Sequence, residues 1–133
     1  MLRYLLFIPV ILLAVSCKKE DISGDTKVLR TVTSLSEFES EIGSGVTLVF
    51  YHAVWCTKCA AQRPAVEALT KDDAIKAAAF LQVDYEKVKE VVTKYGVQGF
   101  PTIHIYKDNQ LKHDLSGPGH TQAELTALVK ALL

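Results

Sequence analysis

Cysteine is scarce in this chain, and neither positive nor negative charge is in excess. The three cysteines of the 133-residue sequence are Cys17, which follows an apolar run, and the close pair Cys56 and Cys59. Cysteines in such unlike contexts do not form a disulfide framework. Fifteen basic residues balance fifteen acidic ones, so the sequence lacks the clustered positive charge typical of a nucleic-acid-binding protein. We therefore expect no nucleic-acid partner.

The sequence also has no internal repeat, no low-complexity tract and no room for a second full domain. Nearly half of its residues are apolar, which suits one compact domain of ordinary size with a short appendage. We expect one monomeric domain over residues 28–133, preceded by an N-terminal extension over residues 1–27.

No apolar run in the sequence is long enough for a typical membrane-spanning helix. Residues 4–15 are almost wholly apolar, follow the single cation Arg3 and contain Pro9, whereas a spanning helix needs about 20 apolar residues. A short apolar core behind a positive charge is typical of a signal peptide. We therefore predict that residues 1–16 are a signal peptide and that the protein is exported.

The end of this run, Leu13-Ala14-Val15-Ser16-Cys17, resembles the lipobox of bacterial lipoproteins. The resemblance implies cleavage before Cys17, lipidation of its sulfur and a polar tether over residues 17–27. A simple secretory signal and an uncleaved N-terminal anchor are the alternatives, and all three place the domain outside the cytoplasm. We predict a lipid-anchored protein of the bacterial cell envelope, on the periplasmic side or exposed at the surface.

The rest of the chain has the pattern of an α/β domain. Residues 46–51 are uncharged and rich in β-branched and aromatic side chains, which predicts a central strand covered on both faces. Four further strands are predicted over residues 28–32, 79–84, 102–106 and 110–115, and four helices over residues 35–42, 56–69, 86–95 and 122–132. Ser34 with Glu37 forms a capping box, Thr121 is a candidate N-cap, and Pro64 predicts a kink.

The motif Trp55-Cys56-Thr57-Lys58-Cys59 directly follows the central strand and opens a helix. Unpaired N–H groups and the macrodipole at a helix start favour a thiolate, so Cys56 is the predicted nucleophile. Lys58 adds a cation near it, although an exposed ammonium is screened by water and salt. A spacing of three places both sulfurs on one side of a helix, so Cys59 can resolve a mixed disulfide at Cys56.

Together, these residues resemble the thioredoxin family. Trp55, Pro64 and Phe100-Pro101 match the family's tryptophan, helix proline and cis-proline segment. The resemblance implies a thioredoxin-like three-layer α/β sandwich with a central mixed sheet, a redox-active Cys56–Cys59 disulfide, and a cis Pro101 beside it. Backbone groups of Phe100 could then pair with an extended substrate strand.

The chain departs from the family at a buried charged pair. The family's aspartate six residues before the nucleophile is Phe50 here, and the accompanying lysine is Phe80. Losing both avoids an unpaired buried charge, but it leaves the proton acceptor for Cys59 unassigned. His52 is the nearest titratable candidate, because its ordinary pKa of about 6.5 suits proton transfer. A histidine that merely fills an aromatic position is the alternative.

Three other interpretations of the cysteine pair remain. A purely structural disulfide is poorly motivated, because closing so short a loop gives little entropic stabilisation. Cys56, Cys59 and His52 could bind zinc or copper, although no second motif completes such a site. The remaining histidines, His104, His113 and His120, fit solvated surface positions, but His104 faces opposite to its neighbours Ile103 and Ile105 and is either covered by a helix or open to water. The third is a module that binds exported peptides without turnover.

We predict an envelope thiol-disulfide oxidoreductase that acts on the thiols and disulfides of exported proteins through the Cys56/Cys59 dithiol. We expect the reductive direction. Oxidation and isomerisation stay open as alternatives, because Thr57-Lys58 matches neither the Gly-Pro of a strong reductant nor the Pro-His of a strong oxidant. No bound cofactor and no metal are required, because the dithiol itself carries two electrons. A membrane thiol-relay protein is the expected electron donor, or the acceptor if the flow is reversed.

Overall fold

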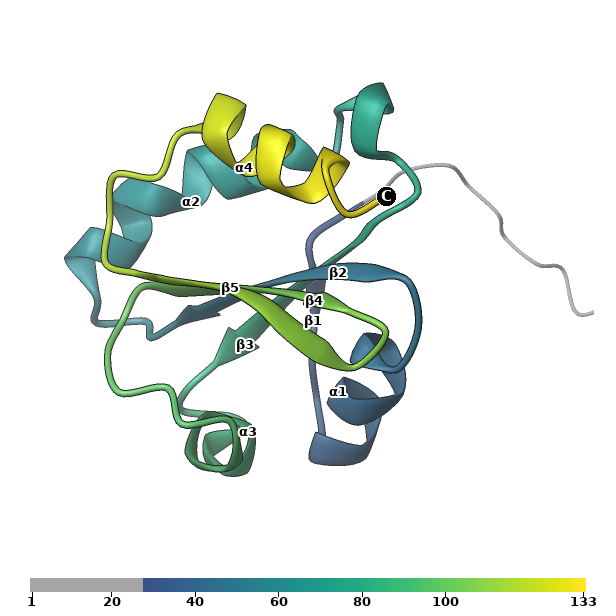
Figure 1. Ribbon diagram of the computed structural model, residues 1–133. Coiled ribbons are helices and arrows are strands. Elements are labelled where there is room, and N and C mark those ends of the chain that lie inside the picture. The colour runs from purple at the N-terminus through teal and green to yellow at the C-terminus, as the bar shows by residue number, and fades with distance from the viewer. Residues whose placement is uncertain (1–27) are drawn as a thin grey trace, which may run out of the picture.

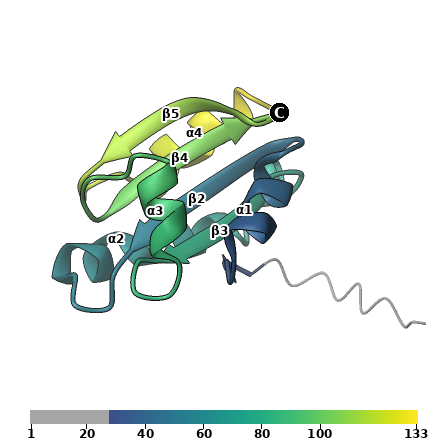
Figure 2. The same ribbon diagram turned by 90° about the horizontal axis from the view of Figure 1, so that it is seen from below.

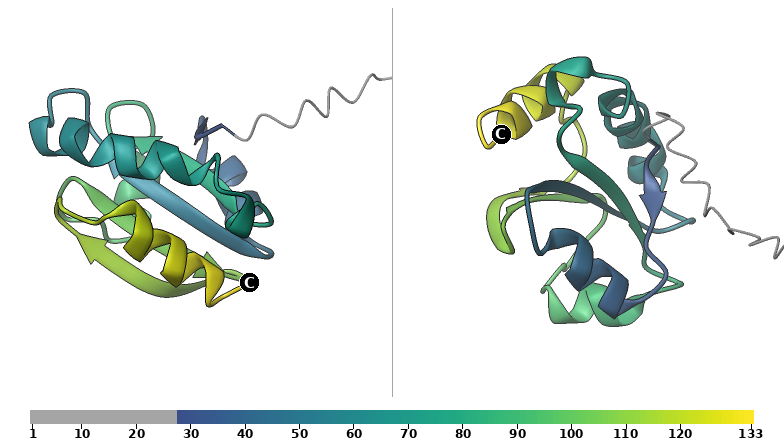
Figure 3. Two further views of the ribbon diagram at one scale, coloured as in Figure 1. Left: turned by 90° about the horizontal axis from the view of Figure 1, so that it is seen from above. Right: turned by 90° about the vertical axis from the view of Figure 1, so that its right-hand side faces the viewer.

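The computed structural model describes residues 28–133, in which one sheet lies between two layers of helices. Helices α2 (Thr57–Leu69) and α4 (Gln122–Lys130) cover one face, and α1 (Leu35–Ile42) and α3 (Lys89–Lys94) cover the other (Figures 1 and 2). Figure 3 shows α2 and α4 side by side over the sheet. The predicted three-layer sandwich is confirmed. The predicted signal peptide, Cys17 and the tether lie outside the described residues.

The sheet is mixed, as predicted. Its strands are β1 (Arg30–Thr31), β2 (Val46–His52), β3 (Ala79–Asp84), β4 (Thr102–Lys107) and β5 (Gln110–Ser116), in the order β1-β3-β2-β4-β5. β3 pairs in parallel with both β1 and β2, whereas β4 is antiparallel to β2 and to β5. All seven residues of β2 are buried, because this strand has neighbours on both edges and helices on both faces.

Two predicted helices are shorter than expected. The helix predicted over residues 86–95 begins only after Val88, because the carboxylate and the carbonyl of Asp84 accept hydrogen bonds from Glu86, Lys87 and Val88 N–H groups and hold a turn there. The helix predicted to residue 132 ends at Lys130. A short 3₁₀ helix, η1 (Asp73–Ile75), was not predicted; Asp72 caps it by accepting a hydrogen bond from the Ala74 N–H.

The capping signals are partly confirmed. Ser34 Oγ accepts from the Glu37 N–H at 3.2 Å, and Thr121 Oγ1 accepts from the Glu124 N–H at 3.2 Å. The return bond of the predicted capping box is different, because the Glu37 carboxylate accepts from the N–H and hydroxyl of Thr33 rather than from Ser34. This pair of bonds holds the pKa of Glu37 below its ordinary value.

The β4–β5 hairpin turns at Asp108 and Asn109, whose φ angles of 48° and 67° lie in the left-handed region that Asp and Asn tolerate. Asp108 also accepts from the Gly45 N–H at 2.8 Å, which ties the turn to the start of β2. A bulge between Ile105 and Tyr106 then shifts the register, so Asp114 lies opposite His104.

The structure decides between the two positions that the sequence left open for His104. Its side chain is 2% exposed and lies on the sheet face covered by α1 and α3, against Tyr51 and Tyr106 of that core. Its Nδ1 is 3.0 Å from the Tyr106 hydroxyl, and its ring packs edge-on against Tyr51. Burial lowers the pKa of His104, which keeps the imidazole neutral near pH 7.

Candidate redox site

The cysteine motif lies at the surface, directly after the carboxyl end of β2. After His52 the chain passes through exposed Val54 and Trp55, and Cys56 becomes the N-cap of α2. Cys56 and Cys59 form a disulfide with a Cα–Cα distance of 5.2 Å. The predicted juxtaposition of the two sulfurs at a helix start is therefore confirmed.

The two cysteines differ in exposure. Cys59 is 3% exposed and packs in the core below α2, whereas Cys56 is half-buried. The Cys59 N–H donates to Cys56 Sγ at 3.1 Å, in the position of a helix N-cap bond. This donor and the helix start both stabilise negative charge on Cys56 Sγ. Lys58, the second residue of α2, is exposed to solvent.

Three aromatic side chains, Trp55, Tyr85 and Phe100, lie beside the disulfide, and we call them the aromatic wall. The Phe100–Pro101 peptide bond is cis, as the family resemblance implied. The Phe100 ring lies 6.2 Å from the Trp55 ring and 5.2 Å from that of Tyr85. Trp55 is 65% exposed and donates from Nε1 to Glu86 Oε1 at 3.1 Å. Within residues 28–133, no hydrogen bond uses the backbone N–H or C=O of Phe100, so both groups are available to a bound strand.

His52 lies at the end of β2 with its ring stacked on Phe50 at 5.5 Å between centroids. The side chain is buried, and its Nε2 has no hydrogen-bond partner among the described residues. Burial lowers the pKa of His52, the nearby Arg63 charge adds to this effect, and Asp84 opposes it. The imidazole is therefore neutral near pH 7. No hydrogen bond within residues 28–133 links it to either cysteine.

Phe50 and Phe80 occupy the positions of the family's charged pair, and both are buried in the same apolar cluster as Cys59. The Arg63 guanidinium lies over the Phe50 ring at 5.3 Å from its centroid, and it donates to Gln82 Oε1 at 2.8 Å. Cation–π contact and this hydrogen bond satisfy Arg63 without a carboxylate in the core. The surroundings of Cys59 are accordingly apolar.

Sequence reasoning missed several residues at this end of the molecule. Tyr85 and Glu86, in the turn after β3, contact Phe100 and Trp55, and no pattern in the sequence marks them. Gln62, one turn beyond Cys59, is 2% exposed and holds the loop before α4 through its bonds to Gly119 and His120. The sequence did offer one signal for Gln62, because it is a polar residue on the buried face of a predicted helix.

The described part of the chain offers no cluster of three or more His, Cys, Asp or Glu side chains that could hold a metal ion. The metal interpretation of Cys56, Cys59 and His52 therefore gains no support. Nor do residues 28–133 contain a helix with the length and apolar character needed to cross a bilayer.

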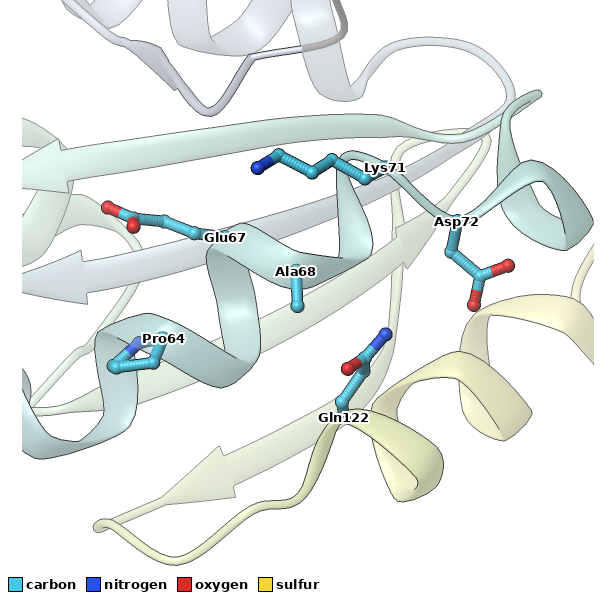
Figure 4. A pocket seen from close by; sticks show the side chains of 6 residues that line it. All are labelled: Pro64, Glu67, Ala68, Lys71, Asp72 and Gln122. Atoms are coloured by element: carbon cyan, nitrogen blue, oxygen red, sulfur yellow. The ribbon is translucent and has the colours of Figure 1, made fainter.

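Two surface hollows differ in their relation to the disulfide. One, of about 480 Å³, lies between α2 and the start of α4, where Ala68 and Gln122 face each other; Figure 4 shows its lining, which includes none of the predicted site residues. The other, of about 610 Å³, includes Phe100 and Pro101 and extends along the β4–β5 hairpin to His104 and Asp114. Only this second hollow adjoins the redox end.

Comparisons with known proteins agree with this geometry. The family model described as Thioredoxin matches residues 29–131, which include both cysteines and the cis bond. The chain is 30% identical over 102 residues to Thioredoxin Asp f 29 of Aspergillus fumigatus, covering 75% of this chain and 91% of that protein. It is 36% identical over 75 residues to a thioredoxin of Staphylococcus aureus, covering 56% and 71% of the two chains.

Solved structures give the same result. Plasmodium falciparum thioredoxin superposes with a TM-score of 0.69 at 28% identity, covering 79% of this chain and 100% of that one. Malassezia sympodialis thioredoxin has a TM-score of 0.72 at 20% identity, covering 80% and 91% of the two chains. The second similarity, at that identity, concerns the fold alone.

Proposed function

Because the chain belongs to the thioredoxin family and is a thiol-disulfide oxidoreductase, we propose that it reduces disulfides of exported proteins at the bacterial cell envelope. One observation carries the proposal: a half-buried Cys56 at a helix start is bonded to a buried Cys59, beside an aromatic wall with a free backbone segment. Such a site lets a substrate sulfur reach Cys56 first.

The reduced protein begins the reaction with Cys56 as a thiolate. It attacks one sulfur of a substrate disulfide, the other substrate sulfur leaves as a thiolate and takes a proton, and a mixed disulfide forms. Cys59 then loses its proton and attacks Cys56 Sγ, which releases the second substrate thiol and leaves the Cys56–Cys59 disulfide. Two electrons pass from protein to substrate. Of the two protons that the substrate thiols take up, one corresponds to the Cys59 proton and the other comes from solvent. A membrane thiol-relay protein then restores the dithiol.

We propose His52 as the group that accepts the proton of Cys59. Its support is a buried, neutral imidazole whose Nε2 has no partner within the described residues, at the end of the strand that leads to the motif. Attack by Cys59 requires removal of a proton in apolar surroundings, where a charged thiolate is disfavoured. A His52→Ala variant should therefore show a changed pH–rate profile for resolution, and an unchanged profile would remove the assignment.

The envelope location rests on the N-terminal sequence. A cationic start, an apolar core and the Leu13-to-Cys17 segment support export and lipidation of Cys17. Expression of the full chain and of Cys17→Ala, followed by fractionation and mass measurement, tests this. We expect a lipid mass on Cys17 and membrane association that the variant loses. A soluble exported product from both chains would favour a simple secretory signal, and a membrane-bound variant would favour an uncleaved anchor.

The reduction potential tests the direction of electron flow. A Cys17→Ser protein, which keeps only the Cys56–Cys59 couple, is equilibrated with glutathione, with Cys56→Ser and Cys59→Ser variants as controls. A reduction potential of about −270 mV, as for thioredoxin, supports a reductant, whereas one of about −120 mV indicates an oxidant. Absence of a two-electron couple would contradict the proposal and favour a peptide-binding role. Cys59→Ser should trap a mixed disulfide with substrate, and Cys56→Ser should not.

A further inference from the structure

The second hollow, which we call the hairpin groove, begins at Phe100 and Pro101 and continues over Thr102, His104, Asp114 and Ser116. Its volume is about 610 Å³, enough for more than one side chain. His104 and Asp114 face each other across β4 and β5 because the bulge brings them into register. The groove is therefore continuous with the segment at which a substrate strand is proposed to pair.

The groove has one charged side chain. Apart from His104, the residues that line it are Gly, Val, Gln, Phe, Pro, Thr and Ser together with Asp114. Since burial keeps His104 neutral near pH 7, the Asp114 carboxylate gives the groove a net negative charge. The Asp114 side chain is 57% exposed, so an arriving ligand can reach it.

The Asp114 carboxylate is held in place by one of its two oxygens. Oδ1 lies 3.4 Å from His104 Nε2 and 3.5 Å from Ser116 Oγ. His104 is itself fixed by the Tyr106 hydroxyl, which lies 3.0 Å from Nδ1, and by the edge-on ring of Tyr51. Oδ2 has no hydrogen-bond or ion-pair partner within residues 28–133. A carboxylate oriented in this way has one oxygen left for a cationic ligand.

We propose that the hairpin groove receives a lysine or arginine side chain of the disulfide-bearing polypeptide, with Asp114 as its counter-ion. The inference rests on the proposed function, because it assumes that the substrate strand pairs with the backbone of Phe100. Successive side chains of such a strand point to opposite faces, so one near the scissile disulfide lies along the groove. The uncharged stem of a lysine fits the Phe100 and Pro101 end, and its ammonium reaches Asp114.

Reduction kinetics test the inference. Two disulfide peptides are compared that differ at one position near the cystine, with lysine in one and glutamine in the other. The unaltered protein should have a higher kcat/KM for the lysine peptide. Asp114→Asn should reduce that preference by up to about fivefold, the upper end for an exposed ion pair. Glu90→Gln, which removes an exposed carboxylate from α3 outside the groove, is the matched control and should keep the preference.

Binding without chemistry separates this inference from the proposed function. The same peptides with serine in place of cysteine are titrated while the amide shifts of Thr102, Asp114 and Ser116 are followed by NMR. We expect larger shifts and tighter binding for the lysine peptide, lost in Asp114→Asn. If both disulfide peptides are reduced equally well, the groove assignment is wrong although the reductase function stands. If neither is reduced but the lysine peptide binds, the reductase function is wrong and the cation site stands.

Discussion

The two halves of the core, one on each face of the sheet, differ in polarity. Under α2 and α4 the hydrophobic cluster consists of aliphatic residues and phenylalanines together with Cys59, and this half also buries Gln62 and His52. Under α1 and α3 the core also contains Tyr51, Tyr106 and His104, which form a chain of polar contacts within the hydrophobic packing. A single strand supplies both halves, since Ile103 and Ile105 of β4 face one side and His104 the other.

The difference leaves the cluster around Cys59 without charged side chains. It contains no carboxylate or lysine, because Phe50 and Phe80 occupy those positions, and His52 is buried next to Phe50. Apolar surroundings disfavour a charged thiolate, which is why attack by Cys59 is expected to need a proton acceptor. The opposite half tolerates polar groups because each of them has a partner: the Tyr106 hydroxyl lies between Tyr51 and His104, at 3.5 and 3.0 Å.

The largest effect should follow from a cavity in the apolar half. Ile105 is fully buried in the same cluster as Cys59, so Ile105→Ala should lower the free energy of unfolding by about 2–5 kcal/mol. Urea unfolding of the oxidised protein measures this loss. A matched truncation on the surface, Leu111→Ala at 47% exposure, should change stability little. A small loss in Ile105→Ala would mean that α2 and α4 close over the gap.

Much of this layout is predictable from the sequence, for physical reasons. The helix over residues 35–42 and the strand over residues 79–84 were predicted with the bounds that the structure has. The helix is delimited by a serine cap and a glycine, and the strand is a short, mostly apolar run. The redox motif was identified because its position between a buried strand and a helix is local information. The cis Pro101 came from family resemblance.

The polar half was not predictable, because it depends on non-local register. Alternation along β4 shows that His104 faces away from Ile103 and Ile105, but not what covers it. Simple pairing around the hairpin turn would place His113 opposite His104; the bulge adds Lys112 as an extra residue and brings Asp114 there instead. No residue pattern marks that bulge. The same applies to α3, which a side chain of β3, Asp84, shortens.

A smaller effect is expected from breaking the polar chain of contacts. Tyr106→Phe removes one hydroxyl and leaves the buried Nδ1 of His104 and the Tyr51 hydroxyl without that partner. The cost should be about 1–3 kcal/mol, the range for an unsatisfied buried polar group. Tyr95→Phe is the control, because Tyr95 lies in the same cluster but makes no hydrogen bond through its hydroxyl within residues 28–133. Equal losses in the two variants would show that the contacts add no stability beyond packing.

The smallest effect should appear in the dependence of stability on pH, where each half contributes one histidine. Burial lowers the pKa of both His52 and His104 in the folded protein. The unfolded chain takes up a proton on each near its ordinary pKa of about 6.5. Below that pH the unfolded state binds more protons, so the free energy of unfolding falls as the pH falls. Urea titrations at pH 7.5 and pH 5 of His52→Leu and His104→Leu should therefore each show a smaller fall than the unaltered protein.

The two variants should not be equal, because the charges near the two rings differ in sign. Arg63 and Lys87 add to the lowering of the His52 pKa, against Asp84 alone, whereas the nearby charge at His104 is Asp114, which opposes the lowering. These charges should consequently strengthen the pH dependence due to His52 and weaken that due to His104. His113→Gln serves as the control on the hairpin, since His113 is only half-buried. A larger effect at His104 would mean that burial, which is deeper there, outweighs the opposing charge of Asp114.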